Sequence, residues 1–205
     1  MPAIGDSLAA AAAVLAAGGV VALPTETSYG LAVDPGKEAP LRRLYALKKR
    51  PPNKPLSLVA ADTNQLYQVI TTIPPCYEPL MERFWPGPLT LIFPARADIH
   101  PLVRAADGTV AVRISSHPAP TTLSSLYGSP LTATSANLAG EPPRFSAHKV
   151  AELFGDEVDY IFDAATYTPI AQSSTIVGVK NGELVLHRGG AIDFTDICLP
   201  NAGFM

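Results

Sequence analysis

Residues 175–187 read Thr-Ile-Val-Gly-Val-Lys-Asn-Gly-Glu-Leu-Val-Leu-His. Apolar residues alternate on both sides of Asn181-Gly182, and Asn-Gly between alternating segments is the strongest short-range signal for a β-hairpin. The stretch therefore predicts two antiparallel strands, at 175–179 and 184–187. A hairpin in a chain that otherwise alternates helices and strands indicates a sheet with both parallel and antiparallel pairs.

Upstream of the hairpin, short apolar segments alternate with helix-forming segments that begin at capping residues or prolines and end at Gly or Pro. Expected helices cover 6–17, 40–48, 64–70, 75–84, 120–127 and 146–154. Expected strands cover 20–23, 31–33, 56–59, 89–93, 109–114, 131–134 and 159–162. The tail after Ala191 is expected to be ordered only in part. The predicted class is α/β, with a mixed sheet and flanking helices.

Composition restricts the class of protein. The chain has 205 residues, 47% hydrophobic and 16% charged, which predicts one globular domain over 1–205 with ample core. The N-terminal apolar run is too short to span a membrane and lacks the basic flank of a signal peptide. Two cysteines at no ligand spacing imply no structural metal and suit a reducing cytoplasm. A net charge of −3 argues against a protein that coats nucleic acid.

Cations nevertheless gather in one place. Residues 48–54 read Lys-Lys-Arg-Pro-Pro-Asn-Lys, and six of the fifteen Lys and Arg residues fall between 42 and 54 with no acid among them. An acidic protein with such a cluster has either an anion site or a helix end carrying solvated cations. Composition alone leaves the two interpretations about even.

Other polar groups stand at strand ends or in turns, where ligands bind in α/β sheets. They are residues 24–30, the strand 109–113 that ends in Arg113, residues 132–137, and residues 173–175 with Arg188 across the hairpin. Each has a plain structural alternative: Ser-Ala-Asn can be a turn, Arg113 can pair with a structural acid, and Glu26 can be a base or can hold its turn. No phosphate loop, dinucleotide fingerprint, zinc helix or nucleophile elbow is present.

Taken together and in order, these stretches resemble the YrdC-like family of threonylcarbamoyl-AMP synthases over about residues 12–192. The matching stretches are 23–27 (Leu-Pro-Thr-Glu-Thr), 29–31 (Tyr-Gly-Leu), 47–51 (Leu-Lys-Lys-Arg-Pro), 84–90 (Phe-Trp-Pro-Gly-Pro-Leu-Thr), 110–113 (Val-Ala-Val-Arg), 134–137 (Thr-Ser-Ala-Asn) and 174–177 (Ser-Thr-Ile-Val). The resemblance implies a twisted mixed sheet with a concave basic cavity.

The resemblance also implies a reaction, that of a nucleotidyltransferase. Members join L-threonine, bicarbonate or CO₂ and ATP, which is accompanied by Mg²⁺, into threonylcarbamoyl-AMP and pyrophosphate. The product supplies the threonylcarbamoyl group for adenosine 37 of tRNA. Contact with tRNA or double-stranded RNA and with other tRNA threonylcarbamoylation proteins is a further expectation, and no membrane is involved.

Residue roles follow from the same resemblance. The expected catalytic cations are Lys48, Arg50 and Arg113. The expected L-threonine contacts are Thr25, Tyr29, Arg113, Ser135 and Ser174. The expected ATP contacts are Lys48, Arg50, Lys54, Thr109, Asn137 and Arg188. Cations with hydroxyls suit phosphate and carboxylate binding, so catalysis is expected to rest on positioning and charge stabilisation.

Two alternatives remain at this point: a non-catalytic RNA-binding module that uses the basic cavity, and an enzyme that adenylates carbamoyl phosphate, since hydrogenase-maturation carbamoyltransferases contain the same fold. The chain also departs from the family pattern. Val59 stands where many members have His, and Gly178 replaces an acid that is usual after Ser-Thr.

Overall fold

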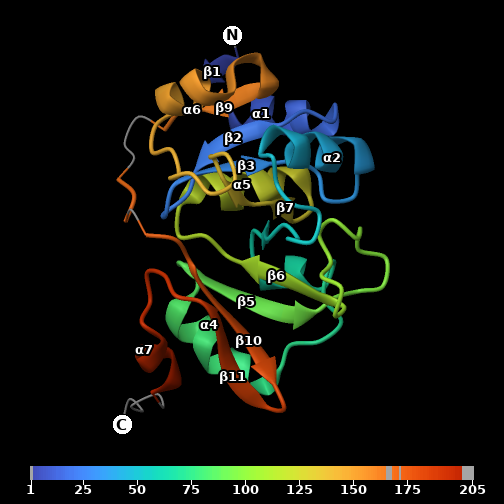
Figure 1. The fold of residues 1–205 in the computed structure, drawn as a ribbon, viewed down its shortest axis with the longest axis vertical. Helices are drawn as coiled ribbons and strands as arrows, with labels where there is room; N and C mark the ends of the chain where they lie inside the picture. Colours follow the sequence, from blue (N-terminus) through green and yellow to red (C-terminus); the bar gives the residue numbers. More distant parts are fainter. Residues whose placement is uncertain (1, 165–167, 171, 200–205) are drawn as a thin grey trace.

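The computed structural model describes residues 2–164, 168–170 and 172–199. Its strands form two sheets, which lie one above the other along the long axis of the molecule (Figure 1). The upper sheet has the order β1 (Ala3–Gly5), β9 (Tyr160–Phe162), β2 (Val21–Pro24), β3 (Tyr29–Ala32) and β8 (Thr134–Ser135). The lower sheet has the order β11 (Glu183–Arg188), β10 (Thr175–Lys180), β5 (Leu89–Pro94), β6 (Thr109–Arg113), β4 (Leu58–Val59) and β7 (Leu131–Thr132).

Both sheets are mixed, as the sequence predicts. In the upper sheet β2 and β3 form an antiparallel pair, while β9 runs parallel to β1 and β2. In the lower sheet β5 is antiparallel to β6 and parallel to β10, and β4 is parallel to β6. The predicted α/β class is confirmed, with the strands divided between two sheets.

Several helices begin or end at residues that cap them. They are α1 (Leu8–Ala16), α2 (Glu38–Leu47), α3 (Thr63–Leu66), α4 (Glu78–Phe84), α5 (Pro118–Tyr127), α6 (Ala147–Phe154) and α7 (Phe194–Cys198), with short 3₁₀ turns before α4 and after α6. Ser7 and Ser146 cap α1 and α6 by accepting a hydrogen bond from the backbone N–H three residues on. Gly128 ends α5 in the left-handed region at φ 83°.

The terminal hairpin has the predicted turn. Asn181 and Gly182 both have positive φ, 54° and 84°, as a type I′ turn requires. The pairing runs from Lys180 opposite Glu183 to Ile176 opposite Arg188. The hairpin therefore places Arg188 beside the first residues of β10.

The core continues from one sheet into the other. One cluster of buried side chains joins Leu31 of β3 to Leu58 of β4 and Leu91 of β5, and a smaller cluster lies between α1, α5 and the upper sheet. Strand alternation divides β2 and the residue before it between the two clusters: Val20 and Ala22 lie in the first, and Val21 and Leu23 lie in the second. The upper sheet is therefore packed on both faces.

The structure differs from the predicted elements in several places. The strand expected over 131–134 is divided into β7 in the lower sheet and β8 in the upper sheet. The helix expected over 64–70 ends at Leu66, after which Gln68 and Val69 continue in turns. The strand β1 is not among the expected strands, because it is defined by its pairing with β9, which lies more than 150 residues away in the sequence. Within the tail, the structure adds a helix that was not expected, α7, which is capped by Asp193; residues 200–205 lie outside the described part. Among the described residues, no helix is long and apolar enough to cross a membrane.

Candidate functional site

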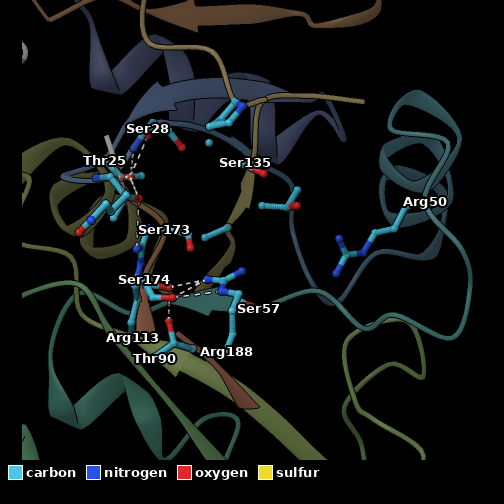
Figure 2. Close-up of a pocket in the computed structure, with 16 residues that line it drawn as sticks. Thr25, Ser28, Arg50, Ser57, Thr90, Arg113, Ser135, Ser173, Ser174 and Arg188 are labelled. Carbon is cyan, nitrogen blue, oxygen red and sulfur yellow. Dashed lines mark hydrogen bonds between the residues drawn. The ribbon is translucent and has the colours of Figure 1, made fainter. Parts of the chain in front are cut away.

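A polar pocket of about 380 Å³ lies where the ends of strands from the two sheets meet. Figure 2 shows hydroxyl side chains and arginines pointing into this space from several elements. Its lining residues are Thr25, Thr27, Ser28, Gly30, Arg50, Ser57, Thr90, Arg113, Ala133, Thr134, Ser135, Pro143, Gln172, Ser173, Ser174 and Arg188.

The upper wall is the turn between β2 and β3. Thr25 Oγ1 donates to the Ser28 carbonyl at 2.8 Å and accepts from the backbone N–H of Thr27 and Ser28. Strand alternation then places Ser28 and Gly30 on the pocket side and Tyr29 on the core side. Tyr29 is 1% exposed, and its hydroxyl donates to Asp163 at 3.3 Å. The structure therefore does not bring Tyr29 to the pocket.

The end of α2 separates the cation cluster into three environments. The N–H of Arg50 donates to the Tyr45 carbonyl and that of Lys49 to the Ala46 carbonyl, at 2.9 and 3.0 Å, which is the Schellman pattern. Lys49 occupies its left-handed position, with φ 50°. As a result Lys48 points inward, Lys49 is exposed, and Arg50 reaches the pocket.

Lys48 is 2% exposed and does not line the pocket. Its ammonium donates to the carbonyls of Ser135 and Asn137 and to Asn137 Oδ1, the last two at 2.8 and 3.0 Å. Burial lowers the pKa of Lys48 to about 7, and the charge of Arg50 acts in the same direction, whereas three oxygen acceptors favour the protonated form. Lys48 thus joins the end of α2 to the loop after β8, behind Ser135.

Arg50 enters the pocket from the side opposite Thr25 and Ser174 (Figure 2). Its Nε donates to the Lys54 carbonyl and its Nη2 to the Pro55 carbonyl, both at 2.8 Å. The Lys54 side chain is exposed and lies outside the lining. Lys54 therefore contributes through its backbone, which holds the guanidinium of Arg50.

Replacing Lys49 by glycine is expected to raise the free energy of unfolding by about 0.5 to 1 kcal/mol, because a residue with a Cβ is strained in the left-handed region. Lys49→Ala, which keeps the Cβ, is the matched control and should bring no gain. Urea unfolding of both variants measures the effect. A Lys49→Gly variant no more stable than Lys49→Ala would contradict the strain argument.

Arg113 ends β6 and faces the pocket because strand alternation turns its neighbours Val110 and Val112 to the core and Arg113 to the other side. Its Nη1 lies 3.0 Å from Glu26 Oε1, with both side chains 9% exposed. Thr109 begins the same strand at its other end, where its hydroxyl donates to Asp107 at 2.7 Å. The length of β6 therefore places Thr109 outside the lining of the pocket.

The lower wall is a network of Thr90, Ser174 and Arg188. Arg188 donates to the Ser174 carbonyl and to Ser174 Oγ, and that hydroxyl lies 2.8 Å from Thr90 Oγ1. Burial lowers the pKa of Arg188, and the charges of Arg113 and Arg50 lower it further. The three pocket arginines are thus close enough to affect one another, which favours anionic ligands.

Ser135 lines the pocket, while Asn137 lies behind it. Asn137 Oδ1 accepts from Ser135 Oγ at 2.6 Å and from Lys48, and its Nδ2 donates to the Glu141 carbonyl. The amide is therefore engaged in holding the loop. The expected nucleotide contact of Asn137 is not part of this arrangement.

The structure brings six of the predicted residues to one pocket: Thr25, Arg50, Arg113, Ser135, Ser174 and Arg188. It places five elsewhere: Tyr29, Lys48, Lys54, Thr109 and Asn137. Ser57 and Thr90 also line the pocket and were not among the predicted site residues. Each interrupts an otherwise apolar strand segment, Leu-Ser-Leu and Leu-Thr-Leu, and that pattern of one polar residue between apolar neighbours could have revealed them.

The departure at Gly178 does not affect the pocket. Gly178 pairs with Val185 in the hairpin, four residues beyond Ser174. A Cβ there would come within 2.6 Å of His187 Nε2, so the glycine leaves room for the histidine ring. An acid at this position would lie on the hairpin and outside the lining.

Residues 13–190 match the Sua5/YciO/YrdC family, whose description is "Telomere recombination". Threonylcarbamoyl-AMP synthase of Chromohalobacter salexigens is 39% identical over 178 residues, covering 87% of this chain and 95% of that protein. The corresponding protein of Nitrosococcus oceani is 40% identical over 156 residues, covering 76% and 84%.

Among solved structures, Pyrococcus abyssi Sua5 in complex with L-threonine superposes with a TM-score of 0.88 and 34% identity. The match covers 96% of this chain and 59% of that one, so the chain spans about three fifths of this longer relative. Sequence and structure agree, and the chain belongs to the Sua5/YciO/YrdC family.

Proposed function

We propose that this chain is a threonylcarbamoyl-AMP synthase, which joins L-threonine, bicarbonate or CO₂ and ATP and releases pyrophosphate. The observation that carries the proposal is the convergence of Arg50, Arg113 and Arg188 on one hydroxyl-lined pocket. Relatives that carry this name and a Sua5 structure that contains L-threonine support it.

The pocket suits ATP and bicarbonate, which are anions, and L-threonine, which carries a carboxylate. Arg113, beside the hydroxyls of Thr25 and Ser174, would bind the threonine carboxylate. Arg50 and Arg188, from the opposite and lower sides, would bind the phosphates. The threonine amine adds to CO₂ with loss of a proton. The carbamate oxygen then bonds to the α-phosphorus as the bond to the pyrophosphate oxygen breaks.

These arginines would neutralise the charge that develops at the α-phosphorus, so the chain contributes positioning and electrostatics without a covalent intermediate. The described residues contain no group of three or more His, Cys, Asp or Glu that could hold a metal ion. Glu26, the acid at the pocket wall, already contacts Arg113 and Ser115. Mg²⁺ would enter with the nucleotide substrate, held by its phosphates.

The product would pass its threonylcarbamoyl group to adenosine 37 of tRNA. This step, the tRNA or double-stranded RNA contact, the partner proteins and a cytoplasmic location stay predictions from the family resemblance. The described residues add only that no helix could span a membrane.

Pyrophosphate release from ATP and bicarbonate tests the proposal, with L-threonine, L-serine, L-valine or carbamoyl phosphate as the second substrate. We expect release that requires L-threonine and bicarbonate. Arg50→Ala should lower kcat/KM by on the order of 100-fold, since it removes a cation from the pocket. Lys49→Ala removes an equal charge one residue away, outside the lining, and should have little effect.

Release with carbamoyl phosphate alone would favour the carbamoyl-adenylate enzyme. ATP binding without release in any mixture would favour the RNA-binding module. RNA affinity that falls steeply with salt would support the module directly, because backbone contacts release counterions.

A further inference from the structure

One acid in the pocket wall has no role in the reaction described so far. Glu26 lies in the turn between β2 and β3, and its side chain is 9% exposed. It is absent from the lining of the pocket, whereas its neighbours Thr25 and Thr27 are part of it. A buried carboxylate costs free energy unless it is paired, so its partners indicate its purpose.

Both carboxylate oxygens of Glu26 contact residues at or just past the end of β6. Oε1 lies 3.0 Å from Arg113 Nη1 as an ion pair, without the alignment of a hydrogen bond. Oε2 accepts a hydrogen bond from Ser115 Oγ. Ser115 lies two residues past the end of β6, and Val112 and Ile114 face the core, so Arg113 and Ser115 both point to the opposite side and Glu26 contacts both from a single position.

The backbone at the start of α5 holds Ser115 in turn. Its Oγ accepts from the His117 N–H at 3.2 Å, which directs its own hydrogen toward Glu26. His117 caps α5 by accepting from the Ala119 N–H at Nδ1. A chain of contacts therefore runs from the start of α5 through Ser115 and Glu26 to Arg113.

This chain of contacts connects the two sheets. Glu26 belongs to the β2–β3 turn of the upper sheet, and Arg113 to β6 of the lower sheet. Arg113 Nη1 also donates a hydrogen bond to Thr27 Oγ1 at 3.5 Å across the same gap. The Glu26–Arg113 pair thus links the two walls of the pocket at the guanidinium of Arg113.

We infer that Glu26 is a positioning residue: it holds Arg113 across the sheet gap so that the guanidinium can receive the carboxylate of the amino-acid substrate. The inference rests on the proposed function for the identity of that substrate. Because Oε1 binds by charge and not through an aligned hydrogen bond, a neutral amide of the same shape would not replace it.

The test uses the full chain and measures KM for L-threonine and for ATP separately. Glu26→Gln should raise the threonine KM about tenfold or more and change the ATP KM less than about threefold. Ser115→Ala should shift the threonine KM in the same direction by less. Glu26→Asp, which keeps the charge, should recover part of the loss. Glu38→Gln, an exposed acid paired with Arg42, is the matched control and should match wild type.

A double-mutant cycle distinguishes positioning from a general structural role. In an Arg113→Met background, Glu26→Gln should add no further change to the threonine KM, because Glu26 acts through Arg113. Equal rises in both KM values, or an additive effect in the Arg113→Met background, would overturn the inference.

A readout without turnover separates this inference from the proposed function. The Arg113 Nε–Hε NMR signal, assigned with Arg113→Met, should shift or broaden in Glu26→Gln and Ser115→Ala but not in Glu38→Gln. An unchanged Arg113 signal refutes the positioning role whatever the enzyme does. A changed signal in a protein that releases no pyrophosphate with threonine would uphold it and reject the synthase.

Discussion

Lys48→Met is expected to lower the free energy of unfolding by about 2 to 3 kcal/mol and kcat/KM by on the order of 100-fold. The Lys48 ammonium donates to the Ser135 carbonyl and to two oxygens of Asn137. Methionine has a similar length and no donor, so these oxygens would lose a charged partner. Ser135 lines the pocket, and its wall would move.

The control is Lys49→Met, which removes the same charge from an exposed side chain one residue away and should leave stability and kcat/KM close to wild type. Urea unfolding and pyrophosphate release measure both variants. The family resemblance assigns Lys48 to the nucleotide phosphates, and that role gives a different result. A Lys48→Met protein of wild-type stability, with only the ATP KM raised, would show that Lys48 binds phosphate and does not hold the loop.

The second large effect is expected at Gly190. A Cβ at this position would lie 2.2 Å from the Ser173 carbonyl oxygen and 2.6 Å from the Ser174 carbonyl carbon. These are backbone atoms, so the segment just before β10, which forms part of the lower wall, would have to move. Gly190→Ala should therefore destabilise the protein by about 1 to 3 kcal/mol and reduce kcat/KM by on the order of 100-fold.

Gly189→Ala is a matched control in the same segment, because a Cβ there would meet nothing within 4 Å. It should change stability by less than about 0.5 kcal/mol. Thermal unfolding and pyrophosphate release compare the pair. If both alanines have the same effect, the close approach of Gly190 to the Ser173–Ser174 wall does not determine the pocket geometry.

Local sequence predicted much of the fold because its signals act over a few residues. Ser7 and Ser146 cap helices, Gly128 ends one, and Asn181-Gly182 forms its hairpin turn. The strand β1 and the division into two sheets could not be predicted in this way. Both depend on pairings between distant segments, such as Ala3 with Tyr160.

The candidate site shows the same limit. The motifs indicated which segments gather, and six predicted side chains do meet in one pocket. They did not show which side chain of a motif faces the pocket. Tyr29 points away from Ser28 and Gly30 through strand alternation, and at the left-handed turn of Lys49 the side chain of Lys48 is buried while that of Arg50 reaches the pocket.

The sequence by itself determined the helices, the hairpin and the cation cluster, because capping, turn preference and charge are properties of neighbouring residues. The tertiary structure decided which cations reach the ligand space and which support it. Lys48 is buried and connects the end of α2 to the Ser135–Asn137 loop, because that loop supplies its hydrogen-bond acceptors. Arg113 forms its ion pair with Glu26 because the end of β6 lies beside the β2–β3 turn. Such pairings exist only once the two sheets have come together.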